Sequence, residues 1–193
     1  MTRLSRYFAI LSCLAVLAAG CATPTPSSPP ANAAVERSFE AGGRLSARRG
    51  SDGVAVHFTW RHAPRTDDFD VATPLGQTVA RMRGDPAGVR VERPNEAPAD
   101  YPDWGTLTRA VLGVAIPVDG LASWIQGAGD SKGGADIERD SLGRPLVLRQ
   151  QGWEIVYAYA SDEAPARPMR LVMRYPDSEP IEVRIVVDRF SAP

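Results

Sequence analysis

The sequence predicts a mostly β fold, in which a long antiparallel sheet is rolled or partly rolled and two short helices form a lid. Two observations carry this prediction. From about residue 36 onward the dominant hydrophobic period is two, the period of a strand that buries one face. In the middle of the chain apolar residues instead recur at the spacing of an amphipathic helix.

The strands are predicted from this alternation and from the turns between them. Clear alternation predicts strands at 54–61, 153–159, 169–175 and 181–187, and weaker alternation predicts strands at 42–49, 68–73, 77–83, 87–92, 135–140 and 144–150. Val56, Phe58 and Trp60 share one face of the first segment. Short turns rich in Gly, Pro and Asp, such as Pro-Leu-Gly at 74–76, favour antiparallel pairing of consecutive strands.

Two short helices are predicted between the two sets of strands. The first spans 104–112 and follows Asp103, and the second spans 120–126 with Asp119 as its N-cap. Leu121, Trp124 and Ile125 fall on one face of the second helix. Because both helices lie between strands of one sheet, they can cover one mouth of a curled sheet as a lid.

The N-terminus is predicted to be an address and not part of the fold. Arg3 and Arg6 precede an apolar run that is too short to span a bilayer, and small residues lead to Cys21. This pattern resembles the lipobox of bacterial lipoproteins, although Ala18 stands where an aliphatic residue is usual. The resemblance implies a lipoprotein signal peptide at 1–20, a lipid-anchored Pro-rich tether at 21–35 that is attached through Cys21, and a single domain at 36–193. The alternative is an ordinary secretory signal with an incidental cysteine.

Composition argues against several classes of function. The 22 basic and 23 acidic residues give a formal charge of −1, which leaves no electrostatic footprint for nucleic acid. Two His and two Cys are too few for a His- or Cys-based metal site, so neither a metal nor a cofactor is expected.

The Gly-x-Ser-x-Gly pattern at 129–133 lacks the strand and helix of a hydrolase nucleophile elbow, and we interpret it as a flexible loop. His57 and His62 are interpreted as surface residues, and the acidic residues at 67, 68 and 70 as a solvated strand start. No catalytic residue is predicted, and the protein is not expected to be an enzyme.

Several motifs recur in a fixed order along the chain, at residues 39–48, 58–60, 74–80, 116–118, 121–127 and 151–157. As a set they resemble those of the LolB family of outer-membrane lipoprotein receptors. The resemblance implies an incomplete antiparallel β-barrel (half-barrel) with short helices forming a lid over an apolar cavity. It also implies a protein that accepts lipoproteins from a periplasmic carrier (LolA-like) and inserts their acyl chains into the outer membrane. Expected partners are that carrier, lipoprotein acyl chains and outer-membrane lipids, with the protein itself a monomer facing the periplasm. The segment 92–104 is richer in Pro and acidic residues than the resemblance leads one to expect.

Two kinds of site residue are predicted. Leu75, at the tip of the Pro-Leu-Gly turn, is the membrane-insertion residue that the resemblance implies; the alternative is a leucine folded back onto the end of the sheet. Apolar residues that face one side of the predicted strands and helices are candidates for the acyl-chain cavity, and a closed core is an equal alternative for each of them. These candidates are Leu45, Val56, Phe58, Trp60, Trp124, Trp153, Tyr157, Leu171, Met173 and Ile185.

Two other functions stay open at this point: an envelope-assembly scaffold lipoprotein with a solid core, and a lipocalin-like carrier of a small apolar ligand. An acyl chain of about 15 methylenes costs on the order of 12 kcal/mol when it is exposed to water. Transport of such chains therefore needs a deformable apolar cavity and no reacting group. Met169 and Met173, on the apolar face of their predicted strand, suit a cavity of this kind.

Overall fold

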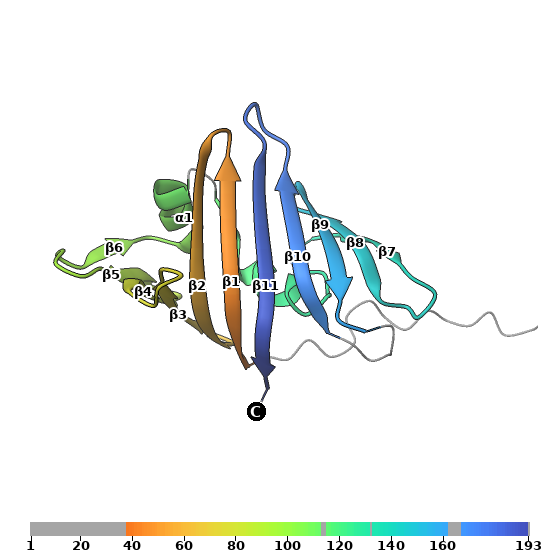
Figure 1. Ribbon diagram of the computed structural model, residues 1–193, viewed down its shortest axis with the longest axis horizontal. Coiled ribbons are helices and arrows are strands. Elements are labelled where there is room, and N and C mark those ends of the chain that lie inside the picture. The colour runs from red at the N-terminus through yellow and green to blue at the C-terminus, as the bar shows by residue number, and fades with distance from the viewer. Residues whose placement is uncertain (1–37, 113–114, 132, 162–166, 193) are drawn as a thin grey trace, which may run out of the picture. The chain divides into compact units, whose positions relative to one another are not determined.

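The computed structural model describes residues 38–112, 115–131, 133–161 and 167–192 (Figure 1). The predicted signal peptide, Cys21 and the tether lie outside the described residues. The elements follow the order β1 (Phe39–Arg49), β2 (Asp52–Ala63), β3 (Thr66–Ala72), β4 (Thr78–Asp85), β5 (Gly88–Glu92), β6 (Ala99–Tyr101), α1 (Trp104–Leu112), α2 (Val118–Trp124), β7 (Asp136–Arg139), β8 (Pro145–Gln150), β9 (Trp153–Tyr159), β10 (Pro168–Tyr175) and β11 (Ile181–Ser191). Neither helix of the described chain is long and apolar enough to cross a membrane.

All of these strands belong to one antiparallel sheet in the order β6-β5-β4-β3-β2-β1-β11-β10-β9-β8-β7. The first and last strands pair in the middle, and every other neighbour in the sheet is also a neighbour in sequence. The sheet is not closed, because β6 and β7 are its two edges. The chain between these edges carries both helices, and Figure 1 shows α2 behind β10 and β11. The helices therefore lie on one face of an open sheet, as predicted.

The main core is formed between this inward face and α2. Trp124 of α2, Ile155 of β9, Leu171 and Met173 of β10 and Ile185 of β11 are each at most 2% exposed. A second, smaller cluster lies under α1, where Leu107 packs against Ala80, Val89 and Val91. α2 is thus part of the main core, whereas α1 is held by a few apolar contacts at one side of it.

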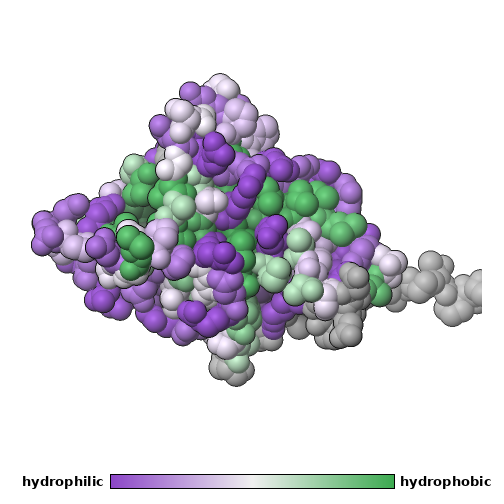
Figure 2. Space-filling view, viewed as in Figure 1, coloured by the Kyte–Doolittle hydropathy of each residue, from purple (hydrophilic) through white to green (hydrophobic). Residues whose placement is uncertain are grey.

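The outward face of the sheet is largely hydrophilic, with apolar patches between the charged side chains (Figure 2). Ion pairs join neighbouring strands across it: Arg61 Nη2 lies 2.9 Å from an Asp70 carboxylate oxygen, and Arg83 Nε lies 2.8 Å from Asp68. Such exposed pairs contribute little stability each, but they keep this face solvated.

Every strand predicted from the alternation is present, with its ends within four residues of the predicted ones, and α1 has the predicted bounds. The structure adds β6, inside the Pro-rich acidic segment. The prediction of Asp119 as the N-cap of the second helix is wrong, because α2 begins at Val118 and Pro117 is the N-cap. The fixed φ of proline suits this position, and the Asp119 carboxylate lies in the first turn, where the helix dipole favours it.

Two β-bulges change which way side chains point. The register of β1 with β11 shifts between Gly42 and Gly43, and the β9–β10 register shifts between Pro168 and Arg170. The second bulge turns Met169 outward to 37% exposure while Met173 stays buried. The expectation that both methionines face the interior is therefore wrong for Met169. At the first bulge, a Cβ on Gly43 would overlap the carbonyl oxygen of Val186.

Gly43→Ala is therefore expected to destabilise the fold by about 1–3 kcal/mol, because the backbone of β1 or β11 has to shift to admit the methyl group. Urea unfolding of this variant and of Gly134→Ala measures the effect. Gly134 is the matched control, since a Cβ there would have no atom within 4 Å. Equal unfolding midpoints for the two variants would contradict the close approach at the bulge.

Candidate functional site

An apolar cavity of about 190 Å³ lies between the inward face of β1–β5 and the two helices. Its wall includes Trp104, Leu107 and Val111 of α1 and Val118 and Leu121 of α2. Among the predicted acyl-chain residues, the wall contains Leu45, Val56, Phe58, Trp60 and Ile185. The described wall side chains are apolar except for Arg93 and Thr108.

The other predicted acyl-chain residues are placed in the main core and not on this wall. They are Trp124, Trp153, Tyr157, Leu171 and Met173, each at most 5% exposed. Burial raises the pKa of the Tyr157 hydroxyl, which has no hydrogen-bond partner among the described residues. Contact of any of these candidates with an acyl chain stays a prediction, but only the first set borders the apolar cavity.

A row of aromatic rings joins the sheet to α1 along the cavity. The Trp60 ring stacks on Phe69 at 4.8 Å between centroids, and Phe69 meets Trp104 edge-on at 5.2 Å. Trp104, the first residue of α1, lies directly on Gly84 of β4, where a Cβ would clash with the indole. The N-terminus of α1 is further fixed by Asp103, whose Oδ1 accepts the Thr106 N–H at 2.6 Å. That hydrogen bond lowers the pKa of the Asp103 carboxyl.

The row is anchored by a buried carboxylate that the sequence analysis did not single out. Asp67 is 6% exposed, and its Oδ1 accepts the Trp60 Nε1–H at 2.8 Å and lies 2.7 Å from His62 Nδ1. The interpretation of His62 as a surface residue and of Asp67 as a solvated one is therefore wrong, whereas His57 is exposed as interpreted. The overlooked signal is that Asp67 alternates with Phe69 and Val71 and so takes an inward position.

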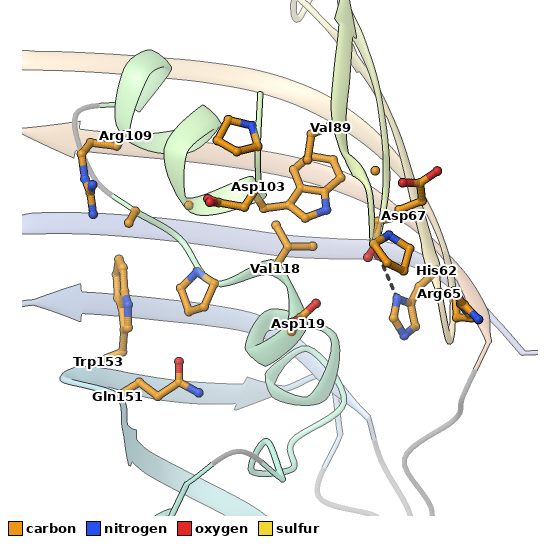
Figure 3. A pocket seen from close by; sticks show the side chains of 18 of the residues that line it. His62, Arg65, Asp67, Val89, Asp103, Arg109, Val118, Asp119, Gln151 and Trp153 are labelled. Carbon is orange, nitrogen blue, oxygen red and sulfur yellow. Dashed lines mark hydrogen bonds and ion pairs between the residues drawn. The ribbon is translucent and has the colours of Figure 1, made fainter. Parts of the chain in front are cut away.

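A polar groove of about 850 Å³ lies beside the cavity (Figure 3). Figure 3 shows His62 and Asp67 at one end, Gln151 and Trp153 at the other, and the carboxylates of Asp103 and Asp119 between them. Carboxylates and cationic side chains together make this groove a poor site for a hydrocarbon chain. No three His, Cys, Asp or Glu side chains within the described ranges are grouped as metal ligands would be.

The described residues of the segment with the Gly-x-Ser-x-Gly pattern are joined to the sheet by hydrogen bonds of Gln150. Gln150 Oε1 accepts the backbone N–H of Asp130 and the Trp124 Nε1–H, both at 2.8 Å. Its Nε2 donates to the carbonyl oxygens of Asp130 and Gly133. The buried Gln150 thus ties this loop to α2, which is a structural role.

Leu75 projects into solvent from the turn between β3 and β4 and is 90% exposed. The turn is held by hydrogen bonds from the Gly76 N–H to the Thr73 carbonyl and from the Thr73 N–H to the Gln77 carbonyl, both 2.8 Å. Gly76 has φ of 84°, which suits glycine at this position. A large apolar side chain is therefore presented by a well-defined turn, and it is not folded back onto the sheet. Val54, Val79 and Val111, which border the cavity, are also exposed.

Comparison with known proteins gives a consistent result. The family model described as "Outer membrane lipoprotein LolB" matches residues 37–190. Proteins named "Outer-membrane lipoprotein LolB" are 36% identical in Thiobacillus denitrificans, over 97% of this chain and 100% of the relative, and 35% identical in Cupriavidus necator, over 90% of each. Among solved structures, a LolA superfamily protein from Nitrosomonas europaea has a TM-score of 0.50 and 9% identity, over 82% of this chain and 87% of that one. This last likeness concerns the fold alone.

Asp67→Ala is expected to destabilise the protein by about 1–3 kcal/mol, because it leaves the buried Trp60 N–H and the His62 ring without their acceptor. Asp68→Ala is the matched control, since the neighbouring carboxylate points outward to Arg83 and its loss should have a much smaller effect. Urea unfolding followed by tryptophan fluorescence measures both. A larger loss for Asp68→Ala would show that the buried carboxylate does not anchor the aromatic row.

Proposed function

Because the chain belongs to the LolB family of outer-membrane lipoproteins, we propose that it receives lipoproteins from a periplasmic carrier of the LolA type and delivers their acyl chains to the outer membrane. The observation that carries this proposal is the apolar cavity between β1–β5 and the helices, which is bordered by exposed valines. The exposed Leu75 lies on the turn between β3 and β4, two strands that contribute to the cavity wall. The proposed partners are the carrier, the acyl chains and the lipids of the outer membrane, with the protein acting as a monomer.

This function needs no chemical step, and we propose that the protein is not an enzyme. Each methylene of an acyl chain that leaves water contributes about 0.8 kcal/mol, so shielding the chain is the main energetic task. A cavity wall of Leu, Val, Phe and Trp side chains supplies that shielding without specific hydrogen bonds. A solid-core scaffold would have no use for such a cavity, and a lipocalin-like carrier would bind a free small molecule instead of a lipidated protein.

The cavity must enlarge to accept a chain, and α1 is the element proposed to move. The volume of the cavity, about 190 Å³, is below the roughly 300–1,000 Å³ of common ligand pockets. α1 is held by the small cluster around Leu107 and by the half-buried Trp104 at its start, whereas α2 contributes Trp124 and Leu121 to the main core. Displacing α1 therefore breaks fewer apolar contacts than displacing α2, and it widens the cavity on the side of β3–β5.

Leu75 is proposed to enter the membrane when cargo is delivered. Burial of one leucine side chain in the acyl region contributes about 2 kcal/mol, which is enough to orient the protein at a bilayer but not to hold it there. Stable attachment is proposed to come from acylation at Cys21. β1 begins at Phe39, and strand directions place this end of the sheet away from the β3–β4 turn: Phe39 pairs with His62, whereas Ala72 pairs with His57. The start of β1 and the β3–β4 turn are thus offset along the strands by about five residues of β2.

Leu75→Glu is expected to load cargo from the carrier normally and to fail in delivery to liposomes, because an exposed turn tolerates a carboxylate that the acyl region does not. Leu142→Glu is a close control: Leu142 also sits in a hairpin turn, is 47% exposed and precedes a glycine at positive φ. Loading and delivery are measured separately with one labelled lipoprotein. Normal delivery by Leu75→Glu, or equal loss in the control, would argue against Leu75 as the membrane-facing residue.

Cys21→Ala is expected to give a soluble protein that still accepts cargo, because the sheet and both helices lie C-terminal to Phe39. Mass spectrometry of the wild-type N-terminus should find an acylated Cys21 as the first residue. An unmodified Cys21, or cleavage at another bond, would refute the lipid-anchor assignment.

A further inference from the structure

The apolar wall of the cavity contains two polar side chains among its described residues. One of them, Thr108, already makes hydrogen bonds within the protein. Thr108 Oγ1 donates to the Trp104 carbonyl at 2.9 Å and accepts the Ile116 N–H at 2.8 Å, which ties α1 to the chain that follows it. The other is Arg93, the single charged residue among the described wall residues. A charged group in the wall of an apolar cavity is costly unless a polar partner or water offsets the charge.

Local backbone structure brings Arg93 to the cavity. It directly follows β5, two residues after Val91, whose side chain is buried in the wall. A turn then reverses the chain: the Glu96 N–H donates to the Arg93 carbonyl at 3.3 Å, with Pro94 and Asn95 between and Asn95 at φ of 62°. The side chain is 27% exposed, so it lies between the apolar wall and solvent.

The Arg93 guanidinium has donors to offer at this boundary. Its Nη1 lies 3.7 Å from an oxygen of Glu96, whose side chain is 61% exposed, a geometry that gives a weak and exchangeable pair. Arginine carries five N–H donors and packs its aliphatic stem on apolar surface while its head stays polar. The side chain can therefore extend the apolar wall and present donors at the same place.

The proposed cargo has acceptors that need such donors. In a lipoprotein the two acyl chains of the diacylglycerol group are joined to glycerol by esters. Each ester carbonyl loses its hydrogen bonds to water when its chain enters an apolar site. A carbonyl without a replacement donor is costly, whereas a charged donor replaces water well. The carbonyls lie where hydrocarbon ends and the polar part of the molecule begins, which is the kind of boundary that Arg93 occupies.

We infer that Arg93 is an ester-recognition residue, whose guanidinium donates hydrogen bonds to the ester carbonyl oxygens of an acylated glycerol while its chains occupy the apolar cavity. This inference rests on the proposed function and adds the chemistry that sets the depth of the chains. The recognised group is the glycerol ester, which lipoproteins share with phospholipids, and not a phosphate.

The test compares ester and ether lipids in a mutant cycle. The mature chain carrying Cys21→Ala is titrated with three lipids: a short-chain diacylglycerol, the dialkylglycerol with ether links in place of the esters, and the ether-linked phosphatidic acid. The change in tryptophan fluorescence, to which Trp60 and Trp104 on the cavity wall contribute, reports each Kd. The wild-type domain is expected to prefer ester over neutral ether lipid by about tenfold. Arg93→Met should bind the two within about twofold and keep the ether-lipid Kd of wild type, which also shows that its cavity is folded.

Two control variants separate the guanidinium from its surroundings. Arg90→Met removes an arginine of the preceding strand β5 that points outward to Asp100, and it should keep the tenfold preference. Glu96→Gln removes the ion pair and leaves the guanidinium, so it should keep the preference as well. Equal ester and ether binding by wild type, or a preference that survives in Arg93→Met, overturns the inference while leaving the proposed function intact. An Arg93-dependent affinity for the ether-linked phosphatidic acid alone identifies a phosphate site and also overturns it. No binding of any of the three lipids by wild type rejects the lipid-binding function together with the inference.

Discussion

The apolar inward face of an open sheet must be covered by other parts of the chain. In this protein the two helices cover the two halves of that face in different ways. Over β8–β11, α2 packs Trp124 into the main core. Over β2–β5, α1 rests on a small cluster and leaves a cavity. The part of the inward face under α1 is therefore where the proposed chain can enter with the least disruption of the main core.

This division explains which parts of the site the sequence predicts and which it does not. Period-two alternation predicts the strands well, because each strand buries one face whatever covers that face. It does not separate Trp60, on the cavity wall, from Trp153, in the closed core, since both occupy inward positions of strands. The difference depends on the distance between each strand and a helix, which is a property of tertiary packing. The list of acyl-chain candidates was for this reason divided between cavity and core.

The remaining differences have local causes. Asp67 takes an inward position because its carboxylate is hydrogen-bonded to the Trp60 N–H and to the His62 ring. Without those partners, an acidic residue at that position of the strand is expected to be solvated. The bulge at Met169 adds one residue to β10 and reverses the alternation next to it. β6 is three residues long, too short for a periodic signal. Each of these features depends on contacts with residues of other strands. The sequence of one strand alone therefore does not predict them.

The separation between the start of β1 and the Leu75 turn has a consequence for sorting. A fully extended chain from Cys21 to Phe39 spans at most about 60 Å, and the eleven residues of β1 span about 36 Å. If Cys21 carries the proposed lipid anchor, a tether of this length would let the Leu75 tip reach the bilayer that holds the domain and would keep the domain close to its attachment point. Under the proposed function, the tether would therefore restrict insertion of cargo to the membrane leaflet in which the protein itself is anchored. The destination would then be set by where the protein is anchored, without separate recognition of the lipids there.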